Sequence, residues 1–116
     1  MTHGEIWLID FGDPLGSLPS KIRPAVVMQN DLLDIKKLNT TVVIPFTSNL
    51  DRADNEPNIL FKKEETGLSK DSVAVIHLIS AINKFCFTRK VYKISEDNYQ
   101  KLVEAVKKLL SNNSSL

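Results

Sequence analysis

The segment Lys21–Asp31, with the sequence KIRPAVVMQND, decides where a strand of this protein starts and where a cation is held. The apolar run Ala25–Met28 is typical of a strand that is buried on both faces. Pro24 has no N–H for a hydrogen bond within a sheet, which suits the first residue of a strand, so we expect the strand to start there. Because a residue before proline is held in an extended conformation, Arg23 is predicted to project from a stiff backbone at the start of this strand.

Short segments rich in β-branched and aromatic residues predict several further strands. The segment 40–47 gives the strongest of these signals and leads into Thr47 and Ser48, with Pro45 marking an edge or a bulge. Because many short strands follow one another without long helices between them, they indicate a barrel or a strongly bent sheet. The other predicted strands are 5–11, 58–61, 72–76, 79–82, 85–88 and 91–94.

The last part of the chain changes to the spacing of a helix, and we expect an amphipathic helix that packs on the sheet or on a partner. Ser95 suits the N-cap of this helix, and acidic residues at its start and lysines near its end match the helix dipole. The expected fold class is therefore α+β, with a polar tail, 111–116, that frays. The apolar positions of the helix are Tyr99, Leu102, Val103, Val106, Leu109 and Leu110.

Length and composition predict one globular domain, 1–116, and exclude several classes of protein. Of the 116 residues, 42% are hydrophobic and 25% are charged, which excludes a disordered or fibrous chain. The formal net charge of +1 argues against a protein that coats nucleic acid regardless of its sequence. No apolar run approaches the length of a bilayer span and the first residues do not resemble a secretory signal, so we expect a cytoplasmic protein without membrane association. Cys86 is the single cysteine, which excludes an internal disulfide.

The residues that remain as candidates for chemistry are Arg23, Thr47 and Ser48. The chain has no P-loop, no glycine-rich dinucleotide turn, and no His-Glu-x-x-His or Cys-x-x-Cys motif, so we expect neither a cofactor nor a metal site. The planar guanidinium of arginine suits a phosphate or a carboxylate, and a hydroxyl can donate to the same oxygens. An arginine that bridges a carboxylate and a threonine that caps a loop would have the same spacing, so a structural role stays open.

Five segments resemble, in order and spacing, the MazF/PemK/Kid family of toxin endoribonucleases, and together they span nearly the whole chain. This resemblance implies an SH3-like β-barrel with a few helices that assembles into a homodimer. It also implies sequence-specific cleavage of single-stranded RNA without a metal, and neutralisation by a cognate antitoxin. The segments are Gly4–Phe11, Gly16-Ser17, Arg23–Asn30, Val43–Ser48, and Gly67-Leu68 followed by Asp71–Val73.

The resemblance also implies roles for particular residues, with Arg23 and Thr47 as the catalytic pair. Independently of the resemblance, the ring of Phe46 is a candidate for stacking on an unpaired base, although a core position is favoured because aromatic residues of strands are usually buried. The chain has Ser80 where many family members have arginine, which alters how RNA would be held but leaves the catalytic pair unaffected. The residues expected to bind the substrate are Ser17, Lys21, Gln29, Phe46 and Ser48.

The expected reaction is an attack of the RNA's own 2′-hydroxyl on the adjacent phosphorus, which leaves a 2′,3′-cyclic phosphate and a 5′-hydroxyl. Arg23 and Thr47 would stabilise the charge that develops on the phosphate oxygens. The general base stays open among His77, Glu5 and Asp13. Two other classes of function stay open as well: a non-enzymatic toxin similar to the CcdB-like gyrase poisons, and an SH3-like nucleic-acid-binding module without chemistry.

Overall fold

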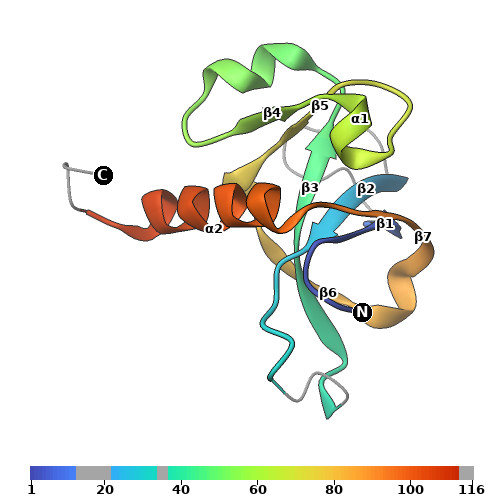
Figure 1. Cartoon of the computed structure of the whole chain (residues 1–116). Helices are drawn as coiled ribbons and strands as arrows, with labels where there is room; N and C mark the ends of the chain where they lie inside the picture. Colours follow the sequence, from blue (N-terminus) through green and yellow to red (C-terminus); the bar gives the residue numbers. More distant parts are fainter. Residues whose placement is uncertain (13–21, 34–36, 113–116) are drawn as a thin grey trace.

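A strongly bent antiparallel sheet of seven strands dominates the computed structural model, which describes residues 1–12, 22–33 and 37–112 (Figure 1). The strands pair in the order β4-β5-β3-β2-β1-β7, and β6 pairs with β3 beside this path. Within the described residues the two ends of this order do not pair, so the predicted barrel is an open, bent sheet. The strands are β1 (Glu5–Asp10), β2 (Ile22–Val27), β3 (Thr40–Thr47), β4 (Ile59–Phe61), β5 (Ser72–Ala74), β6 (Ser80–Asn83) and β7 (Phe87–Lys93).

Two helices and three 3-10 turns complete the described structure, which confirms the α+β class. The helices are the single turn α1 (Lys63–Thr66) and the long α2 (Glu96–Leu110), and the 3-10 turns cover Leu50–Asp54, Ile76–Leu78 and Lys84–Cys86. No helix in the described part of the chain has both the length and the apolar character needed to cross a membrane.

The bend of the sheet is centred on β3, which has the bounds predicted from its β-branched residues. One edge of β3 pairs with β2, while the other pairs first with β6, over Thr40–Val43, and then with β5, over Phe46 and Thr47. The strand changes partners around Pro45, whose backbone N cannot donate a ladder bond. Figure 1 shows β3 running between the part that holds β4, β5 and α1 and the part that holds β6.

Two strand predictions are corrected by the structure. Strand β2 starts at Ile22, two residues before Pro24, because its pairing with β1 already begins there. Pro24 itself pairs only with Leu8 of β1, and the ladder with β3 begins one residue later, at Ala25. The two short strands predicted at 85–88 and 91–94 are one strand, β7, preceded by a 3-10 turn. Strand β7 remains continuous because it follows β1 along its whole length, with two register shifts.

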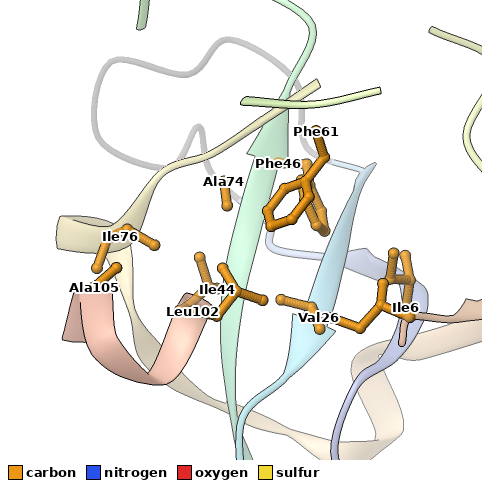
Figure 2. Packing of buried hydrophobic residues seen from close by; sticks show 10 residues of the cluster. Ile6, Val26, Ile44, Phe46, Phe61, Ala74, Ile76, Leu102 and Ala105 are labelled. Atoms are coloured by element: carbon orange, nitrogen blue, oxygen red, sulfur yellow. The ribbon is translucent and has the colours of Figure 1, made fainter. Parts of the chain in front are cut away.

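The main hydrophobic core lies between one face of the sheet and α2. Figure 2 shows Val26 and Ile44 of the sheet facing the same space as Leu102 and Ala105 of the helix. Ser95 caps the helix as predicted, since its Oγ accepts a hydrogen bond from the backbone N of Asn98 at 3.1 Å. Most of the predicted apolar stripe of α2 packs on this core.

Val103 and Leu110 do not belong to this core, and Leu110, in the last turn of α2, is 74% exposed.

A second cluster covers the opposite face of the sheet and consists of Ile9, Ala25, Val27 and Val43. Side chains alternate between the two faces of a strand. In β2 and β3 the even-numbered apolar residues therefore face α2, and the odd-numbered ones face away from it.

Candidate active site

The register between β2 and β3 brings Arg23 and Thr47 together. Ala25 lies opposite Pro45 at the end of the β2–β3 ladder, and Arg23 precedes Ala25 by two residues as Thr47 follows Pro45 by two, so both residues lie at the same end of this strand pair. Both residues are odd-numbered and therefore belong to the face of the sheet that is turned away from α2. The predicted catalytic pair is thus formed by the start of one strand and the end of its neighbour.

Arg23 is a buried cation with an unused donor. Its side chain is only 7% exposed, and Nη1 donates to the backbone oxygen of Phe46 at 2.9 Å. Its Nε is buried and has no hydrogen-bond partner, and no carboxylate within the described ranges pairs with the guanidinium. Burial lowers the pKa of Arg23, but a guanidinium is so weakly acidic that it stays charged near neutrality. Because an unpaired buried charge is costly, this position favours an anion.

Thr47 presents a hydroxyl whose hydrogen is free to be donated. The side chain is 6% exposed, and Oγ1 accepts a hydrogen bond from the backbone N of Asn49 at 3.2 Å. A hydroxyl has one donor and two acceptor positions, so accepting this bond leaves its O–H available. The bond also orients the side chain, because it ties Oγ1 to the turn that follows β3.

Arg23 and Thr47 line an open cavity of about 390 Å³. The opposite wall comes from the segment between α1 and β5, which the sequence analysis did not associate with the site. In this segment Ser72 Oγ donates to the backbone oxygen of Lys70 at 3.0 Å, which helps to hold the loop in place. The lining residues are Leu8, Ile22, Arg23, Pro24, Phe46, Thr47, Ser48, Leu68, Ser69, Lys70 and Ser72.

Lys70 is the functional candidate that sequence reasoning missed. It is exposed and adds a second positive charge to the cavity. The Gly67-Leu68 and Asp71–Val73 segments on either side of it were identified, but nothing in the sequence placed them beside β2 and β3.

Of the predicted substrate-binding residues, Ser48 is exposed to the cavity, whereas the ring of Phe46 is buried in the core. Ser48 is exposed and lines the cavity, so its role in substrate binding stays a prediction. The ring of Phe46 is 1% exposed and packs edge to face on Phe61, with 6.2 Å between ring centroids. The prediction that Phe46 stacks on a base is therefore wrong for this conformation, because an even position of β3 points into the core. Its contribution to the site is the backbone oxygen that accepts from Arg23.

Gln29 does not join the cavity either. It follows the far end of β2, where Oε1 accepts a hydrogen bond from the backbone N of Val42 at 3.3 Å. Ser17 and Lys21, like most of the predicted loop from Gly12 to Ile22, lie outside the described residues.

No carboxylate or imidazole is found among the described residues that line the cavity. Glu5 is buried elsewhere, and its carboxylate accepts hydrogen bonds from Trp7 and Thr2 at 2.9 and 3.0 Å. Burial raises the pKa of Glu5, but these hydrogen bonds outweigh it, so the pKa is lowered overall. His77 is the exposed residue of the 3-10 turn Ile76–Leu78, and Asp13 lies outside the described residues.

Two further observations concern metal ligands and Ser80. Within residues 1–12, 22–33 and 37–112, no three His, Cys, Asp or Glu side chains are gathered so that they could hold a metal ion. Ser80, the first residue of β6, pairs with Val43 of β3 and does not line the cavity. Its buried Oγ has no hydrogen-bond partner in the described structure.

Comparisons with known proteins match the chain along nearly its whole length. The family described as PemK-like, MazF-like toxin of type II toxin-antitoxin system matches residues 2–110. Endoribonuclease MazF6 of Mycobacterium tuberculosis strain H37Rv is 33% identical over 94 residues, which are 81% of this chain and 82% of the relative. Endoribonuclease MazF2 of Mycobacterium bovis has the same identity and coverage.

Two solved structures share the fold at low sequence identity. MazF from Deinococcus radiodurans aligns with a TM-score of 0.74 at 15% identity and covers 95% of this chain and 96% of its own. The Mycobacterium tuberculosis toxin MazF-mt6 aligns with a TM-score of 0.69 at 16% identity and covers 90% and 93%, respectively.

Proposed function

Because this chain belongs to the PemK-like, MazF-like toxin family of type II toxin–antitoxin systems, we propose that it is a metal-independent endoribonuclease that cleaves single-stranded RNA at short specific sequences. The observation that carries the proposal is the buried guanidinium of Arg23, which has an unused Nε and lies beside Thr47 at an open cavity. A phosphodiester is an anion that would supply acceptors for both groups.

The proposed reaction uses the nucleophile of the RNA itself. The 2′-oxygen forms a bond to the adjacent phosphorus while the bond from phosphorus to the 5′-oxygen breaks, giving a 2′,3′-cyclic phosphate and a 5′-hydroxyl. The 2′-hydroxyl loses a proton and the leaving 5′-oxygen gains one. Extra negative charge develops on the phosphate oxygens, where Arg23 and the Thr47 hydroxyl would donate. Each such preorganised donor typically lowers the barrier by about 3 kcal/mol.

The proposed reaction also needs a group that accepts the proton of the 2′-hydroxyl, and none of the described cavity residues has a carboxylate or an imidazole for this role. Arg23 is a poor acceptor because a guanidinium remains protonated at neutral pH. The described wall of the cavity otherwise offers only hydroxyls and the ammonium of Lys70.

The family membership also supports proposals about partners. A homodimer would combine two nearly neutral chains so that their cavities contribute to one RNA-binding surface. A cognate antitoxin would inhibit the enzyme by laying an acidic or apolar segment over the cavity. The protein would act on RNA in the cytoplasm.

The proposal is tested by incubating purified protein with single-stranded RNA in excess EDTA, beside a copy with deoxyribose at the mapped cut position. We expect cleavage of the RNA, with a cyclic phosphate product, and no cleavage of the deoxy copy. Arg23→Lys should lose at least about 99% of the rate, because a point charge replaces the planar fork. Arg89→Lys, on the exposed part of β7, is the matched control.

Three results would contradict the proposal. Cleavage of the deoxy copy would exclude the 2′-hydroxyl as nucleophile. RNA that is bound but stays intact would instead indicate a binding module. Growth arrest that survives Arg23→Ala would indicate a toxin that acts on a protein target, as a gyrase poison does.

A further inference from the structure

A second hollow adjoins the cavity that contains Arg23 and Thr47. Its volume is about 380 Å³, and it shares Ser48, Ser69 and Lys70 with the first cavity. Because three residues belong to both walls, the two hollows lie side by side. We call the second hollow the lysine groove, and its lining residues are Ser48, Leu50, Lys63, Ser69, Lys70 and Asp71.

The lysine groove carries two exposed ammonium groups. Lys70 lies where the two hollows meet, and Lys63 lines only the second one. Asp71 is the acidic residue of this wall, and its Oδ1 accepts a hydrogen bond from the backbone N of Lys63 at 2.9 Å. In the described part of the chain, neither ammonium forms an ion pair with a carboxylate. Both charges are therefore available to an anionic ligand.

The chemistry of this wall suits a sugar–phosphate backbone better than a base. Ser48 and Ser69 supply hydroxyls, which together with lysines are common contacts to phosphate and sugar oxygens. The described residues of this wall include no aromatic side chain, although stacking on aromatic rings is the usual way in which unpaired bases are held. An RNA whose scissile phosphate lies at Arg23 must leave the first cavity, and the second hollow lies next to it along Ser48, Ser69 and Lys70.

We propose that the lysine groove binds the RNA backbone on one side of the cleavage site, with Lys70 contacting the phosphate next to the scissile one and Lys63 contacting a phosphate further along. This inference rests on the proposed endoribonuclease function. The contacts are independent of the bases, so the groove increases affinity for every substrate sequence and does not select among sequences.

The expected magnitude follows from counterion release. Each phosphate contact with single-stranded nucleic acid contributes about 0.7 to the slope of log affinity against log salt, which is about fivefold in affinity at about 0.1 M salt. The double variant Lys63→Gln/Lys70→Gln should therefore lower kcat/KM about 25-fold at this salt concentration, and the salt slope should fall by about 1.4. The matched control is Lys101→Gln/Lys108→Gln, which removes the same charge from a different cavity, beside α2.

The decisive measurement uses RNA oligonucleotides that are shortened one nucleotide at a time from either end toward the mapped cut position. In one of the two series, shortening removes the phosphates that contact the lysines, so the ratio of wild-type to variant kcat/KM should fall to about 1. In the other series these phosphates remain, so the ratio should not change. The cut position and the relative rates on different target sequences should stay the same in the variant.

Other outcomes would overturn the inference and leave the proposed function intact. If the double variant cleaves full-length RNA as fast as the wild type, while Arg23→Lys stays inactive, the groove does not bind the substrate. If the loss is equal for all substrate lengths, the lysines act on the fold or on the cleavage step. If cleavage is unchanged but inhibition by poly-glutamate is lost, the groove binds an acidic polypeptide instead.

Discussion

Replacing Thr47 by valine removes one hydroxyl but keeps the branched shape of the side chain, and we expect this change to abolish most of the RNA cleavage. Thr47 and Arg23 line the same cavity, and the hydrogen bond that the Thr47 oxygen accepts from the backbone N of Asn49 leaves the O–H available as a donor. If this O–H donates to the developing charge on the phosphate, its loss should lower kcat by about 100-fold to 1,000-fold, equivalent to about 2.7 to 4 kcal/mol.

The same substitution should change stability only slightly. Thr47→Val removes the hydrogen bond from Asn49, and a bond of this type contributes about 0.5 to 1.5 kcal/mol. Because Asn49 is exposed, water can replace the lost acceptor, so the cost should lie at the lower end of that range. Valine also favours a strand conformation, which keeps the end of β3 intact. The loss of activity and the loss of stability are therefore well separated in size.

The assay is multiple-turnover cleavage of a fluorophore-labelled RNA, combined with urea unfolding of each variant. Thr47→Ser is the matched control, because it keeps the hydroxyl and should retain activity within about tenfold of the wild type. A donor that acts only in the transition state should lower kcat and kcat/KM equally. If Thr47→Val retains more than a tenth of the wild-type kcat, or if the change appears only in KM, then the hydroxyl does not stabilise the transition state.

The remaining predictions concern stability and use unfolding measurements. The hydrogen bond from the His3 imidazolium to Glu96 raises the pKa of His3 above its ordinary value of 6.5, so the stabilisation is fully present just below pH 6.5 and is lost as pH rises through the raised pKa. The wild type should therefore lose stability relative to His3→Gln as pH rises above 6.5, and a difference that does not change with pH would contradict this. Gly67→Ala should lower the free energy of unfolding in urea by about 1 to 2 kcal/mol, because the residue has φ +70° and a Cβ would lie 2.6 Å from the Tyr92 ring. An unchanged urea midpoint would contradict this and would mean that the ring moves away freely. Leu102→Ala should cost about 2 to 5 kcal/mol, since the side chain is fully buried in the main core, and a cost below about 1 kcal/mol would contradict that packing.

Local signals in the sequence were enough to predict the elements that depend on local chemistry. Strand β3 has its predicted bounds, 40–47, because β-branched residues favour extended backbone without help from a partner. Helix α2 starts after the predicted cap, Ser95, because capping is a contact between residues three apart.

Predictions that depend on the neighbouring strand were less successful. The start of β2 at Ile22 and the continuity of β7 both follow from pairing with β1, which no local pattern encodes. Phe46 was assigned to the substrate although its even position in β3 faces α2. A strand alternates between two faces, but the sequence of one strand does not say which face will be covered.

The sequence by itself determined that Arg23 is held on extended backbone at one end of a strand and that Thr47 lies at the end of another, because proline and β-branched residues act on their immediate neighbours. Only the tertiary structure decided that the two residues line one cavity, since the antiparallel pairing of β2 with β3 brings the start of one strand beside the end of the other. The tertiary structure also placed Lys63 and Lys70 in the lysine groove beside this cavity, although α1, which begins at Lys63, follows β3 by more than a dozen residues. Charges that are distant in sequence become one binding surface only when the sheet bends and brings their loops side by side.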